Sequence, residues 1–200
     1  MSSRFNRVET AVFQKAKKNQ YYCGDSYFYI ETDDEYVCAL ADGLGSGEFA
    51  KESSEIVISI IRENTNVTVE QLIKKCNQQL SGKRGAVIGI LRIDFRIHQY
   101  SFSSIGNIGV VTMTEDGKRK RSIPNAGYLA GYHRSFKVVT DKLDQQTRFI
   151  LFSDGVTDKD LSQRFLLNKD VHQVVQSFAG YVDEDVRADD TTLIAIRYER

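Results

Sequence analysis

The chain has 200 residues, 41% of them hydrophobic, so it is long enough to bury a core without disulfide or metal staples. Its 27 Lys and Arg residues equal its 27 Asp and Glu residues in number, so no net charge attracts the chain to nucleic acid or to a membrane surface. The opening stretch lacks the apolar segment of a signal peptide, and no run approaches the roughly 18 apolar residues of a spanning helix. We therefore expect one cytoplasmic domain, residues 1–200.

The three cysteines, Cys23, Cys38 and Cys76, are an odd number without C-x-x-C spacing. This pattern argues against both a disulfide framework and a structural zinc site. We expect packed or reduced thiols, with Cys38 in the core of a strand.

The first half of the chain begins with strands and continues with helices. Residues 7–15, 21–31 and 35–41 are rich in Tyr, Phe, Val and Ile, which predicts three strands. Apolar residues at helical spacing then predict a helix over 47–64. The run T-V-E-Q, which begins at Thr68, matches a capping box and predicts a second helix that ends near residue 80.

Strand patterns return in the second half of the chain. They cover 85–95, 98–113, 136–140, 148–153 and the closing run TTLIAIRY, with a hairpin turn at Asp116-Gly117 and a helical pattern over 161–180. Antiparallel strands with helices inserted in two blocks predict an α+β fold, in which two packed antiparallel β-sheets are flanked by helices.

The glycine-rich stretch ALADGLGSGEFA, residues 39–50, admits several interpretations. A Walker loop needs G-x-x-x-x-G-K-[ST], which is missing. A dinucleotide fingerprint needs an acidic residue after a second strand, but Glu63 falls within the predicted helix and another helix follows. A plain glycine turn remains open, as does a metal site with Asp42 as a ligand.

Acidic residues recur at the ends of predicted strands. Asp42 and Asp154 each end an apolar strand and precede a glycine, Asp25 lies in a strand, and Asp189-Asp190 precedes the last strand. Carboxylates that converge at one end of a sheet pair repel one another unless a cation is bound. Ligation by oxygen alone favours Mg²⁺ or Mn²⁺ over zinc, and Gly43 can offer its carbonyl as a further ligand.

Six motifs in chain order resemble one known family. They are G-D-S at 24–26, A-D-G-L-G-S-G at 41–47, K-R-G-A at 83–86, S-I-G-N at 104–107, S-D-G at 153–155 and D-D-T-T at 189–192. Together they resemble the metal-dependent serine/threonine protein phosphatases of type 2C, the PPM family, over nearly the whole chain. The resemblance implies an α-β-β-α sandwich with two Mn²⁺ or Mg²⁺ ions at one end.

The resemblance also implies a role for each matched residue. Asp42 would bridge the two metals, and Gly43 would add its backbone carbonyl. Asp154 and Asp189 would be further ligands, and these two together with Asp42 are the predicted catalytic residues. Asp190 would be a second carboxylate of the last motif, and Asp25 would hold metal-bound water.

The chemistry implied by the resemblance is hydrolysis by a metal-activated hydroxide, without a phosphoenzyme. The implied substrates are phosphoserine or phosphothreonine residues of stressosome proteins, whose dephosphorylation resets sigma-B stress signalling. We expect a monomer that binds neither nucleic acid nor membrane. The alternative is a catalytically silent phosphoprotein-binding module on the same fold, although every matched aspartate is retained.

The sequence departs from the family pattern at two positions that concern the phosphate. Many members have a histidine as proposed general acid where this chain has Leu44. They also have an N-terminal arginine that grips the phosphate, whereas this chain has only lysines between Arg7 and Cys23. Lys83 and Arg84 either contribute a positive charge there or form an ordinary basic turn.

Overall fold

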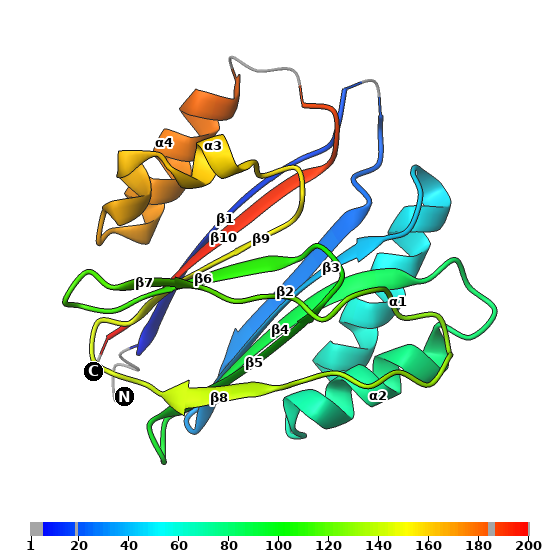
Figure 1. Ribbon diagram of the computed structural model, residues 1–200, viewed down its shortest axis with the longest axis horizontal. Helices are drawn as coiled ribbons and strands as arrows, with labels where there is room; N and C mark the ends of the chain where they lie inside the picture. Colours follow the sequence, from blue (N-terminus) through cyan, green and yellow to red (C-terminus); the bar gives the residue numbers. More distant parts are fainter. Residues whose placement is uncertain (1–5, 19, 184–186, 200) are drawn as a thin grey trace, which may run out of the picture.

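Two five-stranded antiparallel sheets pack face to face (Figure 1). This computed structural model describes residues 6–18, 20–183 and 187–199, and the other positions of the predicted 1–200 domain lie outside the described residues. In strand order, the first sheet contains β1 (Val8–Lys15), β10 (Thr191–Tyr198), β9 (Arg148–Phe152), β6 (Gly109–Met113) and β7 (Arg119–Arg121). The second contains β2 (Asp25–Glu31), β3 (Glu35–Gly43), β4 (Ala86–Asp94), β5 (Gln99–Ile105) and β8 (Val139–Lys142).

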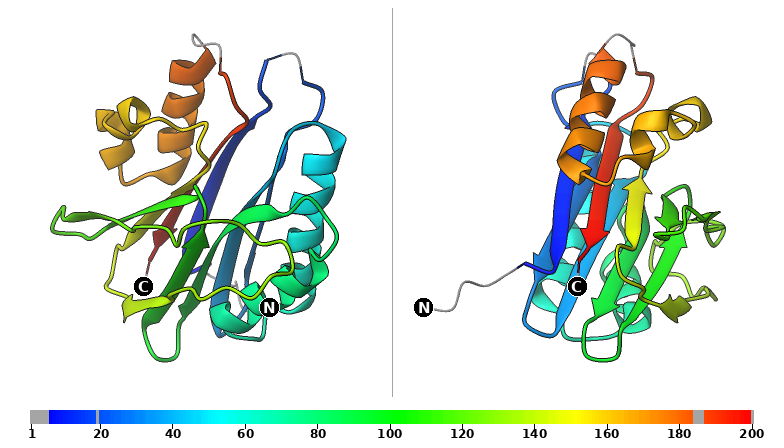
Figure 2. Two further views of the ribbon diagram at one scale, coloured as in Figure 1. Left: turned by 45° about the vertical axis from the view of Figure 1, so that its right-hand side comes forward. Right: turned by 90° about the vertical axis from the view of Figure 1, so that its left-hand side faces the viewer.

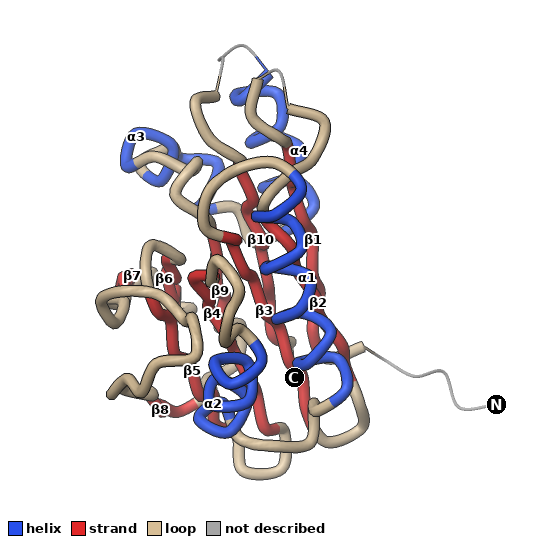
Figure 3. Tube along the Cα trace, turned by 90° about the vertical axis from the view of Figure 1, so that its right-hand side faces the viewer, coloured by secondary structure: helices blue, strands red, loops and turns tan. Residues whose placement is uncertain are grey.

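Helices cover the outer face of each sheet, as Figures 2 and 3 show. The second sheet is covered by α1 (Glu48–Glu63) and α2 (Val69–Gln79). The first sheet is covered by α3 (Asp158–Leu161), the 3-10 helix η1 (Arg164–Leu167) and α4 (Val171–Asp183). The four layers confirm the predicted α+β sandwich. None of the described helices has both the length and the apolarity needed to cross a bilayer.

The core consists of three apolar layers, one between the sheets and one beneath each helix block. Strand β3 serves two of them, because its side chains alternate between its faces. Leu40 packs between the sheets, whereas Ala39 and Ala41 pack beneath α1 and α2. Burial on both faces explains why β3 has a continuous apolar sequence rather than an alternating one. The three cysteines are free and Cys38 is fully buried, which confirms the prediction for them.

One predicted strand is two strands in different sheets. The sequence predicts a single strand over 98–113, but the chain leaves β5 at Ile105 and enters β6 of the other sheet at Gly109. Between them the Gly106 amide donates a hydrogen bond to the Asn125 carbonyl, so this residue pairs with a loop rather than with a strand. The crossing brings Asn107 to the end of the first sheet.

Three other boundaries differ from the sequence prediction. The strand predicted over 21–31 begins only at Asp25, where pairing with β3 begins. The strand predicted over 136–140 is β8, displaced to Val139–Lys142. The helical pattern over 161–180 is divided among α3, η1 and α4, because the apolar residues face one sheet throughout while the chain turns between short helices.

Candidate metal centre

Strand ends from both sheets form an acidic end of the molecule. In the second sheet, Asp25 of β2 lies directly opposite Asp42 of β3. In the first sheet, β9 and β10 are neighbours, so Asp154 after β9 lies beside the segment that precedes β10, which contains Asp189 and Asp190. The structure therefore brings together the five aspartates that the sequence singled out.

Asp25 is held by a buried hydrogen-bond network that joins the two sheets. Asp25 is only 1% exposed, and its Oδ2 accepts a hydrogen bond of 2.6 Å from the Thr192 hydroxyl of β10. Gln14 donates to the Thr192 hydroxyl at 3.2 Å and to the Asp25 carbonyl at 3.3 Å. The other carboxylate oxygen, Asp25 Oδ1, is buried without a hydrogen-bond partner. A buried acceptor is costly unless an ion, a ligand or a water molecule bonds to it.

Burial and neighbouring negative charges raise the pKa of three carboxyls at this end, those of Asp25, Asp42 and Asp154. Burial raises the pKa of the Asp42 carboxyl to about 8, with further contributions from Asp25, Asp154, Asp189 and Asp190 in that order. Burial also raises the pKa of Asp25 to about 6, although its hydrogen bonds oppose the shift. The pKa of Asp154 is raised, first by burial and then by the charge of Asp189. A cation at this end would remove the repulsion.

Asp190 and Asp189 lie in a loop that is held to the N-terminal part of the chain. The two carboxylate oxygens of Asp190 accept hydrogen bonds from the backbone amides of Lys17, at 2.9 Å, and Gly24, at 2.8 Å. The Lys17 ammonium lies 3.5 Å from Asp189 Oδ1. Asp190 thus ties two loops together, and its predicted role as a metal ligand stays a prediction.

Gly43 sits where strand β3 passes against the start of α1. A Cβ atom at this position would lie 1.8 Å from the Ala50 carbonyl oxygen, so no side chain fits. This close approach is an independent reason for glycine at position 43. The next residue, Leu44, packs against the apolar core between the sheets, so the position where many family members have histidine offers no proton donor.

Sequence reasoning missed several residues that organise this end of the fold. Asn107 donates a hydrogen bond of 2.6 Å to Asp154 Oδ2, and Thr192 holds Asp25. Both lie inside the quoted motifs S-I-G-N and D-D-T-T, which was the available signal. Arg187 and Asp160 form a buried ion pair at 2.7 Å between the loop before β10 and α3, with no signal in either residue alone.

The donor set fits a hard divalent cation. The assembled side chains offer carboxylate oxygens, and one of these oxygens is buried without a partner. Within the described ranges, however, no three His, Cys, Asp or Glu side chains already have the spacing to hold a metal ion. The five aspartates thus lie at one end of the molecule without the spacing of a formed metal site, and their assignment as ligands stays a prediction.

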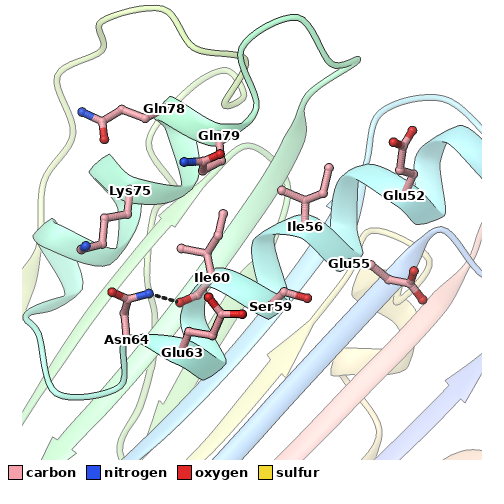
Figure 4. Close-up of a pocket in the computed structure, with 10 residues that line it drawn as sticks. All are labelled: Glu52, Glu55, Ile56, Ser59, Ile60, Glu63, Asn64, Lys75, Gln78 and Gln79. Carbon is pink, nitrogen blue, oxygen red and sulfur yellow. Dashed lines mark hydrogen bonds between the residues drawn. The ribbon is translucent and has the colours of Figure 1, made fainter.

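A separate open groove of about 590 Å³ lies between α1 and α2 (Figure 4). It is lined by Ile56 and Ile60 with polar residues around them, and the Asn64 amide donates a hydrogen bond of 2.8 Å to the Ile60 carbonyl at its end. None of the candidate metal ligands lines this groove.

Comparison with solved structures defines the class of protein to which this fold and acidic end belong. A crystal structure of RsbX in complex with magnesium matches with a TM-score of 0.88 and 34% identity, covering 96% of both chains. The catalytic domain of the serine/threonine protein phosphatase PstP, in complex with two manganese ions, shares the fold with a TM-score of 0.79 at 13% identity, covering 96% of this chain and 99% of that one. The chain therefore has the fold of the PP2C-type phosphatases.

Sequence comparison defines the family within that class. The model for Stage II sporulation protein E (SpoIIE) matches residues 32–199, and the chain belongs to this family. Phosphoserine phosphatase RsbX of Bacillus subtilis is 34% identical over 187 residues, which cover 94% of this chain and 93% of RsbX. Stage II sporulation protein E of Priestia megaterium is 27% identical over 158 residues, or 74% of this chain and 27% of that protein. These relatives confirm the predicted enzyme class and do not favour the catalytically silent alternative.

Proposed function

We propose that the chain is a divalent-metal-dependent phosphatase that removes phosphate from phosphoserine or phosphothreonine residues of stressosome proteins and so resets sigma-B stress signalling. Its similarity to phosphoserine phosphatase RsbX over nearly the full length of both chains supports the substrate class. The observation that carries the activity is the convergence of five aspartates around Asp42, whose pKa burial and neighbouring charges raise to about 8.

The proposal assigns the metal ligands to the converged residues. They are Asp42, Gly43, Asp154 and Asp189, with Asp190 as a further carboxylate and Asp25 in contact with the water around the ions. We propose two ions, Mg²⁺ or Mn²⁺, in line with the magnesium in the RsbX structure and the two manganese ions in PstP. When bound, such ions supply a nucleophilic water and neutralise the charge of the phosphoryl group.

The remaining contributions come from the chain's own residues. The Thr192 hydroxyl, itself held by Gln14, fixes the Asp25 carboxylate and leaves its Oδ1 available as a hydrogen-bond acceptor. The amide of Asn107 occupies one oxygen of Asp154 and leaves the other for a ligand role. The Lys17 ammonium, beside Asp189, adds a positive charge where an anionic substrate must approach.

Hydrolysis of p-nitrophenyl phosphate with and without Mn²⁺ tests the metal-dependent activity. We expect turnover that a chelator abolishes and that Asp42→Asn lowers by at least about a hundredfold, as expected when a group that stabilises transition-state charge is lost. Asp116→Asn is the matched control, since this aspartate lies in the exposed β6–β7 turn. Turnover that survives both the chelator and Asp42→Asn would refute the proposal.

The substrate and the state of the protein need their own measurements. Incubation with phosphorylated stressosome proteins, followed by mass spectrometry of the phosphosites, identifies which phosphoserine or phosphothreonine residues are removed. We propose that residues 1–200 act as one domain, as a cytoplasmic monomer. Size-exclusion chromatography with light scattering gives the mass, and a dimer mass would contradict the monomer.

A further inference from the structure

Arg84 lies beside the loop that carries the candidate metal ligands. It precedes β4, and the first residue of that strand, Ala86, is paired with Gly43 of β3. The Leu44 amide donates a hydrogen bond of 3.0 Å to the Gly85 carbonyl, so the two segments stay together beyond the strands. The K-R-G-A turn is therefore fixed against the A-D-G-L-G-S-G loop.

The Arg84 side chain lies over an aromatic ring and beside the backbone of the glycine-rich loop. Its guanidinium carbon lies 5.0 Å from the ring centroid of Phe49, a residue that is 60% exposed in the first turn of α1. Its Nη1 atom lies 2.7 Å from where a Cβ of residue 45 would be, and Gly45 has a φ of +105°. A side chain at position 45 would displace the guanidinium. The arginine is thus positioned by an aromatic face and by the loop backbone.

Arg84 differs from its neighbours in having no carboxylate partner in the part of the chain that the structure describes. The preceding residue, Lys83, forms an ion pair of 2.7 Å with Glu52. At the same end of the molecule, Lys17 is paired with Asp189. An exposed, oriented guanidinium without an internal anion has its donor fork available for an external one.

We infer that Arg84 is a specificity-determining residue, which binds an acidic side chain close to the phosphoserine of the substrate. This inference rests on the proposed function. Asp25 is buried and Asp42 is half-buried, whereas Arg84 and Phe49 are exposed. A phosphoserine that reaches Asp42 therefore places its neighbouring residues over the rim that Arg84 and Phe49 form. Residues within about two or three positions of the phosphoserine are in reach, at roughly 3.5 Å per residue.

The chemistry of the rim explains why a carboxylate is the preferred group. A guanidinium binds a carboxylate through two parallel N–H donors, and its stacking on Phe49 reduces the conformational freedom lost on binding. The exposed ring also offers an apolar surface to the peptide beside the acidic residue.

Two phosphopeptides that differ only in one residue, Glu or Gln two positions from the phosphoserine, test the inference. We expect wild-type protein with Mn²⁺ to show a kcat/KM about tenfold higher for the Glu peptide, chiefly through KM. Arg84→Ala should bring this ratio close to one, and Arg84→Lys should restore part of it. Lys83→Ala, which removes the adjacent charge already paired with Glu52, should retain the full preference.

Hydrolysis of p-nitrophenyl phosphate by the same proteins separates the failure of this inference from failure of the proposed function. Equal losses on both peptides and on p-nitrophenyl phosphate in Arg84→Ala would place the guanidinium on the phosphoryl group and overturn the inference. A wild-type protein that ignores the Glu-to-Gln change would overturn it as well. Absence of wild-type turnover on all three substrates would instead overturn the proposed function, and this inference with it.

Discussion

The hydroxyl of Thr192 in one sheet donates a hydrogen bond of 2.6 Å to the carboxylate of Asp25 in the other sheet. This buried contact leaves a single Asp25 oxygen, Oδ1, without a partner. One short bond therefore both joins the layers and decides which face of the carboxylate is available. The chemistry of the acidic end therefore depends on strand residues such as Thr192 as much as on the carboxylates themselves.

Replacing Thr192 tests this relationship. Thr192→Val keeps the shape but removes the donor, and leaves a buried carboxylate oxygen unsatisfied, so we expect a loss of about 1–3 kcal/mol in the free energy of unfolding. We also expect the Mn²⁺ concentration for half-maximal activity to rise. Thr192→Ser, which retains the hydroxyl, should restore the Mn²⁺ response. Urea unfolding and a metal titration of activity provide the measurements, and an unchanged Mn²⁺ response in Thr192→Val would rule out the positioning role.

Neutralising Asp42 should stabilise the metal-free protein while abolishing activity. The folded-state pKa of about 8 means that burial and four like charges disfavour the ionised form. Each unit of raised pKa corresponds to about 1.4 kcal/mol before solvent screening, so we expect Asp42→Asn to be more stable by roughly a few kcal/mol at pH 8. Urea unfolding in a chelator measures the gain. A less stable variant would indicate that the carboxylate is not under electrostatic strain.

The same shift predicts a pH dependence of the metal-free protein. Because the pKa of Asp42 is higher when folded, the folded state binds more protons between about pH 4 and pH 8. The stability contribution is therefore complete at low pH and is lost as the pH rises through about 8. The stability difference between Asp42→Asn and wild type should grow over this interval, and unfolding curves at several pH values check it.

Metal binding should release protons between about pH 4 and pH 8. The carboxyl of Asp42, with a pKa of about 8, must be ionised to bind a cation directly. The positive charge of the cation also favours the ionised form of Asp25, whose pKa is about 6. We expect apparent Mn²⁺ affinity to rise between pH 6 and pH 8. Calorimetry at pH 7 in two buffers of different ionisation enthalpy should give different apparent heats, and identical heats would exclude proton release.

The buried ion pair between Arg187 and Asp160 should matter more than any surface pair. Its side chains are 8% and 2% exposed, and it is bidentate, with distances of 2.7 and 3.0 Å. Removal of one partner, as in Asp160→Asn, should cost about 3–5 kcal/mol because the other charge stays buried. The exposed pair Lys118–Asp116 is the control, and Lys118→Ala should leave the melting temperature almost unchanged. Thermal unfolding of the variants compares the two.

The elements that were predicted correctly have local causes. The capping box at the start of α2 is present as predicted, with the Thr68 hydroxyl and the Gln71 side chain satisfying each other's backbone amides. The apolar runs of β3, β4 and β10 are buried on both faces, so their composition alone indicates a strand. The convergence of the aspartates was expected from their place at strand ends together with the family resemblance.

The features that were missed depend on residues far apart in the chain. Gly106-Asn107 marks a turn in the run 98–113, but the change of sheet there depends on Asn125, the amide partner of Gly106, which comes from a later loop. The pairing of Thr192 with Asp25 spans 167 positions. Burial, which decides the pKa of Asp42, arises only once both sheets and α1 are assembled.

Because the acidic cluster is divided between two sheets, its geometry depends on how the sheets pack. Asp25 and Asp42 are carried by one sheet and Asp154 and Asp189 by the other, so their spacing is set by the apolar layer between the sheets. A substitution in that layer, such as Ile194→Ala, would alter the distance between the two halves of the cluster without touching an acidic residue. A destabilising substitution in the hydrophobic core would then be measured as a change in metal affinity.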